Sequence, residues 1–156
     1  MTKQEIQEKA LTLTTEHRSR IRRWVRALRS KRYEKTEGTL RDAGGWCCLG
    51  VACDVYRKAT GLGTWEVDSD GVINGAFKTE NERGHGNMPN VVTEWFGLGG
   101  PHRGDPFLIL SRMDKDGDTT SYASTLNDEK GYSLARIGDR IERSYLPTRA
   151  RRARRS

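Results

Sequence analysis

The chain has 156 residues, of which 34% are hydrophobic and 31% charged, and its formal net charge is +7. This length suits one domain with its own core, and the composition is not that of a disordered chain. No apolar run approaches the roughly 18 residues that cross a bilayer, and the first residues lack the apolar core of a signal peptide. We therefore expect a soluble, intracellular protein with no membrane partner.

Positive charge is concentrated in two segments that contain no acidic residue. Residues 17–33, HRSRIRRWVRALRSKRY, hold eight Lys or Arg, and the end of the chain, PTRARRARRS, holds five Arg. Without those five arginines the net charge falls from +7 to +2. The alternatives are an anionic partner, or a solvated helix face with a solubilising tail. We predict one globular domain over residues 1–146 and a disordered basic tail over residues 147–156.

Residues 14–30 are predicted to form a helix, with Thr14 or Thr15 as its N-cap. One apolar stripe faces the core and is made of Ile21, Trp24, Val25 and Leu28. Four arginines share a flank of the same helix: Arg18, Arg22, Arg26 and Arg29. They can contact a ligand, or their aliphatic stems can cover apolar surface without one.

The segment GGWCCLGVACDVY, residues 44–56, contains all three cysteines of the chain. A short strand is predicted before it, at residues 38–41. Within it, two apolar stripes at helical spacing predict a helix with a wide buried face, made of Cys48, Val51, Ala52 and Val55 and of Leu49, Cys53 and Tyr56. Gly50 in its middle can allow another backbone to approach closely, and Gly61 suits the C-cap.

Four roles are open to these cysteines. A zinc site would have to recruit His85, because adjacent Cys47 and Cys48 seldom share one metal. An odd count in an intracellular protein disfavours disulfides. Cys47 lies near a helix start, which can activate a thiol as a nucleophile. We favour the fourth role, in which all three thiols pack as small apolar groups, and we expect neither a metal nor a cofactor.

The second half of the chain predicts further short elements. TWEVDSDGVINGAF is typical of a β-hairpin turning at Asp70-Gly71. A helix should follow Pro89, with an apolar face of Val91, Val92, Trp95 and Phe96. Residues 107–110 suit one buried strand. A last helix capped by Ser133 should bury Leu134, Ile137, Gly138 and Ile141, with Asn127 and Asp128 in the turn before it.

One segment partly matches the sequence of a calcium-binding loop. DKDGDTTSYAST, residues 114–125, begins like an EF-hand loop with Asp114, Asp116 and Asp118. The sixth position is Thr119 rather than Gly, and the twelfth is Thr125 rather than Glu. We interpret the segment as an acidic turn. The sequence also contains no phosphate-binding or dinucleotide-binding glycine motif.

Four blocks occur in an order that resembles a group of small bacteriophage proteins: VRALRSKRY, GTLRDAGGWCCLGVACDVY, MPNVVTEWFGL and STLNDEKGYSLARIGDRIE. The resemblance covers roughly residues 24–142, and the N-terminal extension and arginine tail look peculiar to this chain. It implies a viral origin but no particular chemistry. A small phage protein of this kind is expected to be an accessory factor, directed at host defence or host takeover.

We expect an α+β domain of three or four helices packed on a small antiparallel sheet, and three functional hypotheses follow. The first is non-enzymatic capture of an anionic small molecule, such as a nucleotide signal of host defence. Its phosphate would meet Arg22, Arg26 and Arg29, a base would stack on Trp24, Trp46 or Trp65, and Asn127 would contact the base edge.

The second hypothesis is nucleic-acid binding through the basic helix and the tail arginines, which are Arg149, Arg151, Arg152, Arg154 and Arg155. The third is a cysteine enzyme that uses Cys47 with His85 and Asp128. An acidic host protein is a further partner that the basic face would fit.

Overall fold

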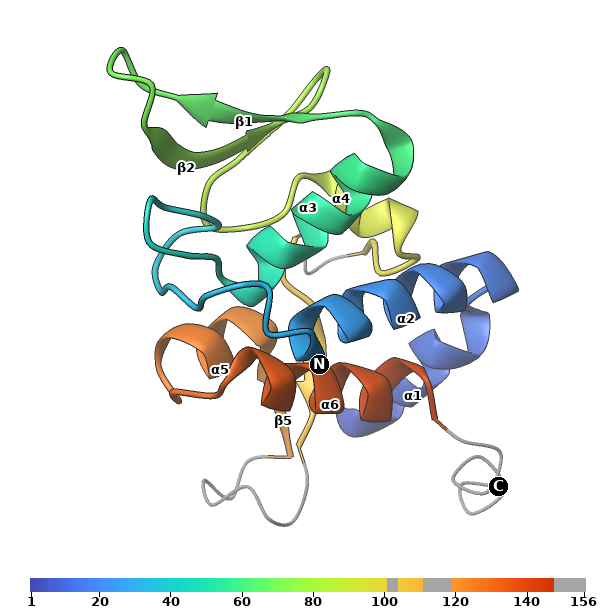
Figure 1. Ribbon diagram of the computed structural model, residues 1–156. Helices are drawn as coiled ribbons and strands as arrows, with labels where there is room; N and C mark the ends of the chain where they lie inside the picture. The colour runs from blue at the N-terminus through green and yellow to red at the C-terminus, as the bar shows by residue number, and fades with distance from the viewer. Residues whose placement is uncertain (101–103, 111–118, 148–156) are drawn as a thin grey trace.

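The computed structural model describes residues 1–100, 104–110 and 119–147, which form an α+β fold (Figure 1). The elements in chain order are α1 (Lys3–Thr12), α2 (Thr15–Arg29), α3 (Cys48–Thr60), β1 (Thr64–Val67), β2 (Ile73–Lys78), β3 (Arg83–Gly84), α4 (Asn90–Trp95), β4 (Phe107–Ile109), β5 (Thr120–Tyr122), α5 (Ala123–Asp128) and α6 (Leu134–Tyr145). The six helices in this part of the chain exceed the three or four predicted, because α1 and α5 have no clear apolar period in the sequence.

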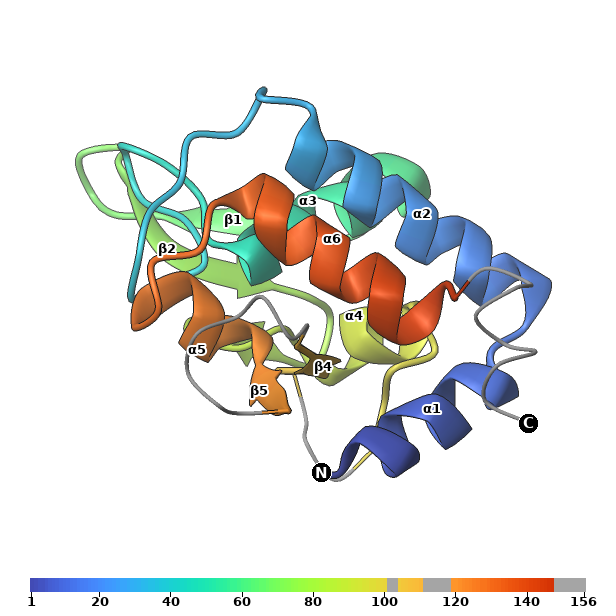
Figure 2. The same ribbon diagram turned by 90° about the horizontal axis from the view of Figure 1, so that it is seen from below.

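Helices α2 and α6 lie side by side and form the base of the core (Figure 2). Thr14 caps α2 by accepting a hydrogen bond from the His17 backbone N–H at 3.0 Å. The apolar stripe predicted for α2 is buried. Ser133 caps α6 as predicted, and Gly138 faces α2, where an added Cβ would stand 3.4 Å from Leu28 Cβ. The hydrophobic periodicity of both helices therefore gave their orientation correctly.

Helix α3 runs through the interior and carries the cysteine segment. Nine consecutive residues of it, 48–56, are buried. The preceding chain crosses its first turn at Leu40, whose carbonyl O accepts a hydrogen bond from the Cys47 N–H at 3.0 Å. A Cβ on Gly50 would lie 1.8 Å from that carbonyl O, so the close approach predicted at Gly50 is confirmed. Residues 38–41 form no strand and contribute one bridge, from Arg41 to Trp46.

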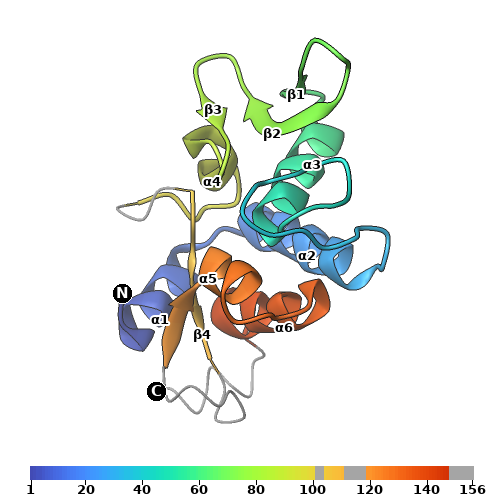
Figure 3. The same cartoon turned by 90° about the vertical axis from the view of Figure 1, so that its left-hand side faces the viewer.

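Two small antiparallel sheets stand at opposite ends of the helical core (Figure 3), whereas only one sheet was predicted. The first has the strand order β1-β2-β3 and contains the predicted hairpin, with Trp65 paired to Phe77. The second pairs β4 with β5, Leu108 opposite Ser121. The predicted buried strand at residues 107–110 is confirmed as β4.

The two unexpected helices explain how the ends of the core are closed. Helix α1 buries Ile6 and Ala10 and contacts α6 and β4. Helix α5 contains Asn127 and Asp128, so the prediction that both lie in a turn is wrong. The turn follows them instead, at residues 129–132, and connects α5 to α6.

Several predictions fall on other parts of the chain. The five tail arginines, and Asp114, Asp116 and Asp118 of the calcium-like loop, lie outside the described residues. Within the described ranges, no helix combines the length and the apolar character needed to cross a membrane.

Candidate functional site

The cysteines are packing groups. All three thiols are free and buried. Cys47 is the N-cap of α3, and its Sγ accepts a hydrogen bond from the Gly50 N–H at 3.3 Å. Burial raises the pKa of the Cys47 thiol to about 12, although the backbone N–H groups of Gly50 and Leu49 favour the thiolate. A nucleophilic cysteine needs a lowered pKa, so the burial of Cys47 argues against the enzyme hypothesis.

The partners proposed for Cys47 are engaged elsewhere. His85 Nε2 lies 3.1 Å from the Asn74 carbonyl O, and Asp128 accepts a hydrogen bond from the Asn127 amide at 2.7 Å. No cluster of three potential metal ligands occurs in the described part of the chain. The zinc interpretation through His85 thus gains no support from the arrangement of the side chains.

The arginine flank of α2 does not act as one unit. Arg29 forms ion pairs across to α6, with Asp139 at 2.6 Å and Glu142 at 3.0 Å. These hydrogen bonds outweigh the cost of partial burial and raise the pKa of Arg29. Arg18 donates a hydrogen bond to the Leu13 carbonyl O at 2.6 Å. Arg22 and Arg26 remain exposed, and neither guanidinium is bonded to a described residue.

Asn127 and Trp24 have structural roles in the core. The Asn127 side chain is fully buried; its Oδ1 accepts from the Cys48 N–H at 3.1 Å and its Nδ2 donates to the Thr36 carbonyl O at 2.9 Å. Trp24 is equally buried, and its Nε1–H donates to the Cys48 carbonyl O at 3.0 Å. Together they anchor the first turn of α3, which leaves neither side chain free to contact a base.

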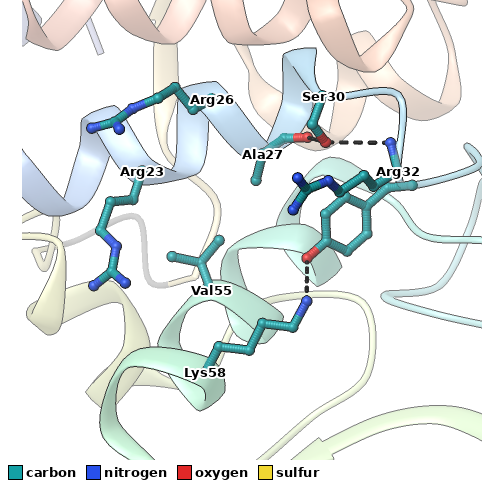
Figure 4. A pocket seen from close by; sticks show the side chains of 8 residues that line it. Arg23, Arg26, Ala27, Ser30, Arg32, Val55 and Lys58 are labelled. Atoms are coloured by element: carbon teal, nitrogen blue, oxygen red, sulfur yellow. Dashed lines mark hydrogen bonds between the residues drawn. The ribbon is translucent and has the colours of Figure 1, made fainter.

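An open pocket of about 420 Å³ lies between α2 and α3 (Figure 4). Its lining, which defines the α2–α3 pocket, comprises Arg23, Arg26, Ala27, Ser30, Arg32, Tyr33, Val55 and Lys58. Of the predicted anion-binding residues, Arg26 lines this pocket, whereas Arg22, Arg29 and Asn127 do not. The arginines come from α2 and the turn after it, and Lys58 rises from α3 on the opposite side.

The α2–α3 pocket is strongly cationic. The guanidinium groups of Arg23, Arg26 and Arg32 have no ion pair or hydrogen bond to any described residue. All three residues are exposed, so each keeps its charge and its N–H donors available to solvent or a ligand. Guanidinium groups bind phosphate and carboxylate groups with two parallel hydrogen bonds. The pocket is therefore suited to an anion that carries several acceptor oxygens.

A buried carboxylate organises the α3 side of the pocket. Asp54 is 2% exposed, and it accepts hydrogen bonds from Tyr33 Oη at 2.7 Å and from Arg57 Nη2 at 3.0 Å. Lys58 Nζ lies 3.0 Å from the same carboxylate and donates to Tyr33 Oη at 3.2 Å. Burial would raise the pKa of Asp54, but bonds from Tyr33, Lys58 and Arg57 outweigh it and lower the pKa. Asp54 thus fixes Tyr33 and Lys58 at the pocket wall.

Beyond Tyr33 the cationic surface meets two tryptophans, in what we term the Arg41–Trp46–Trp65 cluster. Arg41 Cζ lies 3.9 Å from the centre of the Trp46 ring and 5.5 Å from that of Trp65. The two tryptophan rings meet edge to face, with 5.3 Å between their centres. All three side chains are partly exposed. Desolvation by partial burial lowers the pKa of Arg41.

Sequence reasoning found the helix but missed most of the pocket. Arg23 and Arg32 lie in the basic segment, yet the spacing argument selected the neighbouring flank. Lys58 and Tyr33 gave no signal, because their proximity depends on how α2 packs against α3. Asp54 did offer one: it is a single acidic residue inside an otherwise apolar helix, followed by Arg57 and Lys58 at the i+3 and i+4 spacing of ion pairs.

Comparison with known proteins identifies a family and no activity. A sequence model of the family described as Domain of unknown function (DUF8296) matches residues 17–145. These residues run from the first turn of α2 to the end of α6 and include the whole α2–α3 pocket, while α1 precedes them. Neither the curated proteins nor the solved structures contain a match to the chain.

Proposed function

The chain belongs to the DUF8296 family, and because that membership assigns no chemistry, we propose a function from the α2–α3 pocket: non-enzymatic binding of a phosphate-bearing anion. One observation carries the proposal. Arg23, Arg26 and Arg32 line one concavity without a carboxylate partner in the described residues. Elsewhere on the same helix, Arg29 has two such partners.

The energetics favour an anionic occupant. Three like charges around one concavity repel one another, and an anion removes that repulsion while it accepts charge-assisted hydrogen bonds, each of about 1.5–3 kcal/mol. The pocket volume of about 420 Å³ falls within the usual range for small-molecule sites. Binding rather than catalysis is supported by the buried, protonated thiols and by the pairing of Asp54 with its neighbours.

The biological setting is a further proposal that rests on the sequence. The four-block resemblance supports a bacteriophage accessory protein that acts in the host cytoplasm. There the captured anion would be a nucleotide signal of host defence. Nucleic-acid binding is the second candidate, because exposed Arg22 extends the cationic surface along α2 beyond the pocket.

Isothermal titration with inorganic pyrophosphate at physiological salt tests the proposal. Arg26→Glu should weaken binding by about tenfold or more, because it removes one charge-assisted contact and places a carboxylate in the pocket. The matched control is Arg22→Glu, which makes the same charge change one helical turn away but outside the lining. Because Arg22 does not line the pocket, it can act on the anion only through long-range attraction that salt weakens, so the control should have a smaller effect.

Two results would contradict the proposal. If the wild-type protein does not bind pyrophosphate, the α2–α3 pocket is not a phosphate site. If Arg22→Glu weakens binding as much as Arg26→Glu, the attraction belongs to the overall charge of α2 and not to the pocket.

A further inference from the structure

The Arg41–Trp46–Trp65 cluster has features that a purely structural cluster lacks. No described residue accepts a hydrogen bond from the Arg41 guanidinium. Trp65 Nε1 is buried and likewise has no partner in the described chain. Buried polar groups without partners are uncommon, and each carries a desolvation cost. The cluster thus combines a stacked, unpaired cation with two partly exposed indole rings.

The cluster adjoins the α2–α3 pocket directly. Tyr33 lines the pocket, and its ring centre lies 5.0 Å from that of Trp46, edge to face. On Trp46, in turn, the Arg41 guanidinium is stacked with its Cζ 3.9 Å from the ring centre. Asp54 bonds to Tyr33 and Lys58 of the pocket lining, and its charge and that of Arg57 influence the pKa of Arg41. The pocket and the cluster therefore meet at Tyr33.

We propose that the bound anion is a nucleotide unit, with its phosphate in the α2–α3 pocket and its base stacked at the Arg41–Trp46–Trp65 cluster. This inference rests on the proposed function and adds the place where the base of the ligand binds. Guanidinium planes and indole faces both stack on nucleobases, and a cationic surface beside aromatic rings is the usual arrangement for nucleotides and single strands. Inorganic phosphates or simple carboxylates would leave the cluster unused.

Matched probes separate the base from the phosphate. Inorganic pyrophosphate and adenosine 5′-diphosphate share a diphosphate, and only the second carries a base. Stacking should make the nucleotide bind at least about tenfold more tightly to the wild-type protein. A short oligodeoxyadenylate provides the third probe, because a free nucleotide and a single strand share this chemistry. The tighter of the two base-bearing probes identifies the source.

Arg41→Lys is the decisive variant, because it keeps the positive charge but loses the planar stacking group. It should abolish the advantage of the nucleotide and leave pyrophosphate binding unchanged. Trp46→Phe provides a second test should Arg41→Lys fail to fold, since a phenyl ring offers less stacking area. Arg26→Glu should weaken all three probes.

The outcomes distinguish the two proposals. Equal binding of the nucleotide and pyrophosphate, or base-bearing probes unaffected by Arg41→Lys and Trp46→Phe, would overturn the nucleotide inference and leave the phosphate site intact. Failure of all three probes to bind would overturn both. A nucleotide advantage that Arg41→Lys removes would support the inference for whichever source binds more tightly.

Discussion

The contact between Gly50 and Leu40 predicts an unusually severe glycine-to-alanine substitution. A Cβ at position 50 would lie 1.8 Å from the Leu40 carbonyl O and 2.7 Å from its carbonyl carbon. The neighbour is backbone, held by hydrogen bonds from Leu40 N–H to the His85 carbonyl O at 2.9 Å and from Cys47 N–H to the Leu40 carbonyl O at 3.0 Å. Relief of the overlap therefore requires the crossing chain to move away from α3.

The expected loss of stability follows from two costs and one gain. Overpacking in a core costs about 1–3 kcal/mol, and loss of the two backbone hydrogen bonds costs about 1 kcal/mol each. Alanine recovers about 1 kcal/mol of helix propensity. Gly50→Ala should therefore lower the free energy of unfolding by about 2–4 kcal/mol. With a urea m-value near 2 kcal/mol/M, the midpoint should fall by about 1–2 M.

Gly138→Ala supplies the matched control, since Gly138 also lies inside a helix but its added Cβ would make only an ordinary contact, 3.4 Å from Leu28 Cβ. Helix propensity should raise its stability by up to about 1 kcal/mol. Urea unfolding followed by circular dichroism compares both variants with the wild type. A Gly50→Ala protein as stable as the wild type, or stabilised like Gly138→Ala, would refute the close-approach argument.

Two further predictions concern the buried ionisable groups. Burial raises the pKa of Cys47 to about 12, and Cys48 and Cys53 are fully buried. The native protein should therefore not react with Ellman's reagent at pH 8, whereas three thiols should react in urea. A native thiol that is labelled rapidly would contradict this prediction. The pKa of Asp54 is lower in the folded chain than its unfolded value of about 3.9, so its contribution to stability is complete above that pH and disappears as the pH falls through the folded pKa. Urea midpoints measured from pH 6 downward should therefore fall more steeply for the wild type than for Asp54→Asn, whereas Asp70→Asn, which alters an exposed turn, should follow the wild type.

The helices with a strong apolar period were predictable from local spacing. Helices α2 and α6 each bury one continuous stripe, so their faces and caps followed from residues such as Leu28 and Ser133. Helix α1 buries only Ile6 and Ala10, too few to make a period. Helix α5 is a single short stretch that Leu126 and Asn127 hold against the core, which depends on tertiary contacts that no local pattern records.

The site was less predictable, because it depends on which parts of the chain meet. The spacing of the arginines correctly placed Arg26 on an exposed flank. It could not show that Arg29 is neutralised by residues more than a hundred positions later, Asp139 and Glu142. Nor could it show that Lys58 faces α2 across a pocket. Local periodicity determines the face of a helix, whereas pairing across the fold determines which charges stay free.

The packing of α6 has a consequence for how the protein is made. It contacts α1, α2, β4 and α5, yet it follows all of them in the chain. While a ribosome is still adding residues before Leu134, Val25 and Leu28 of α2 lack their contact with α6. Cooperative folding must therefore wait until the last part of the core has emerged. A pause in translation at that stage would prolong the exposure of apolar surface and favour chaperone binding or aggregation of the nascent chain.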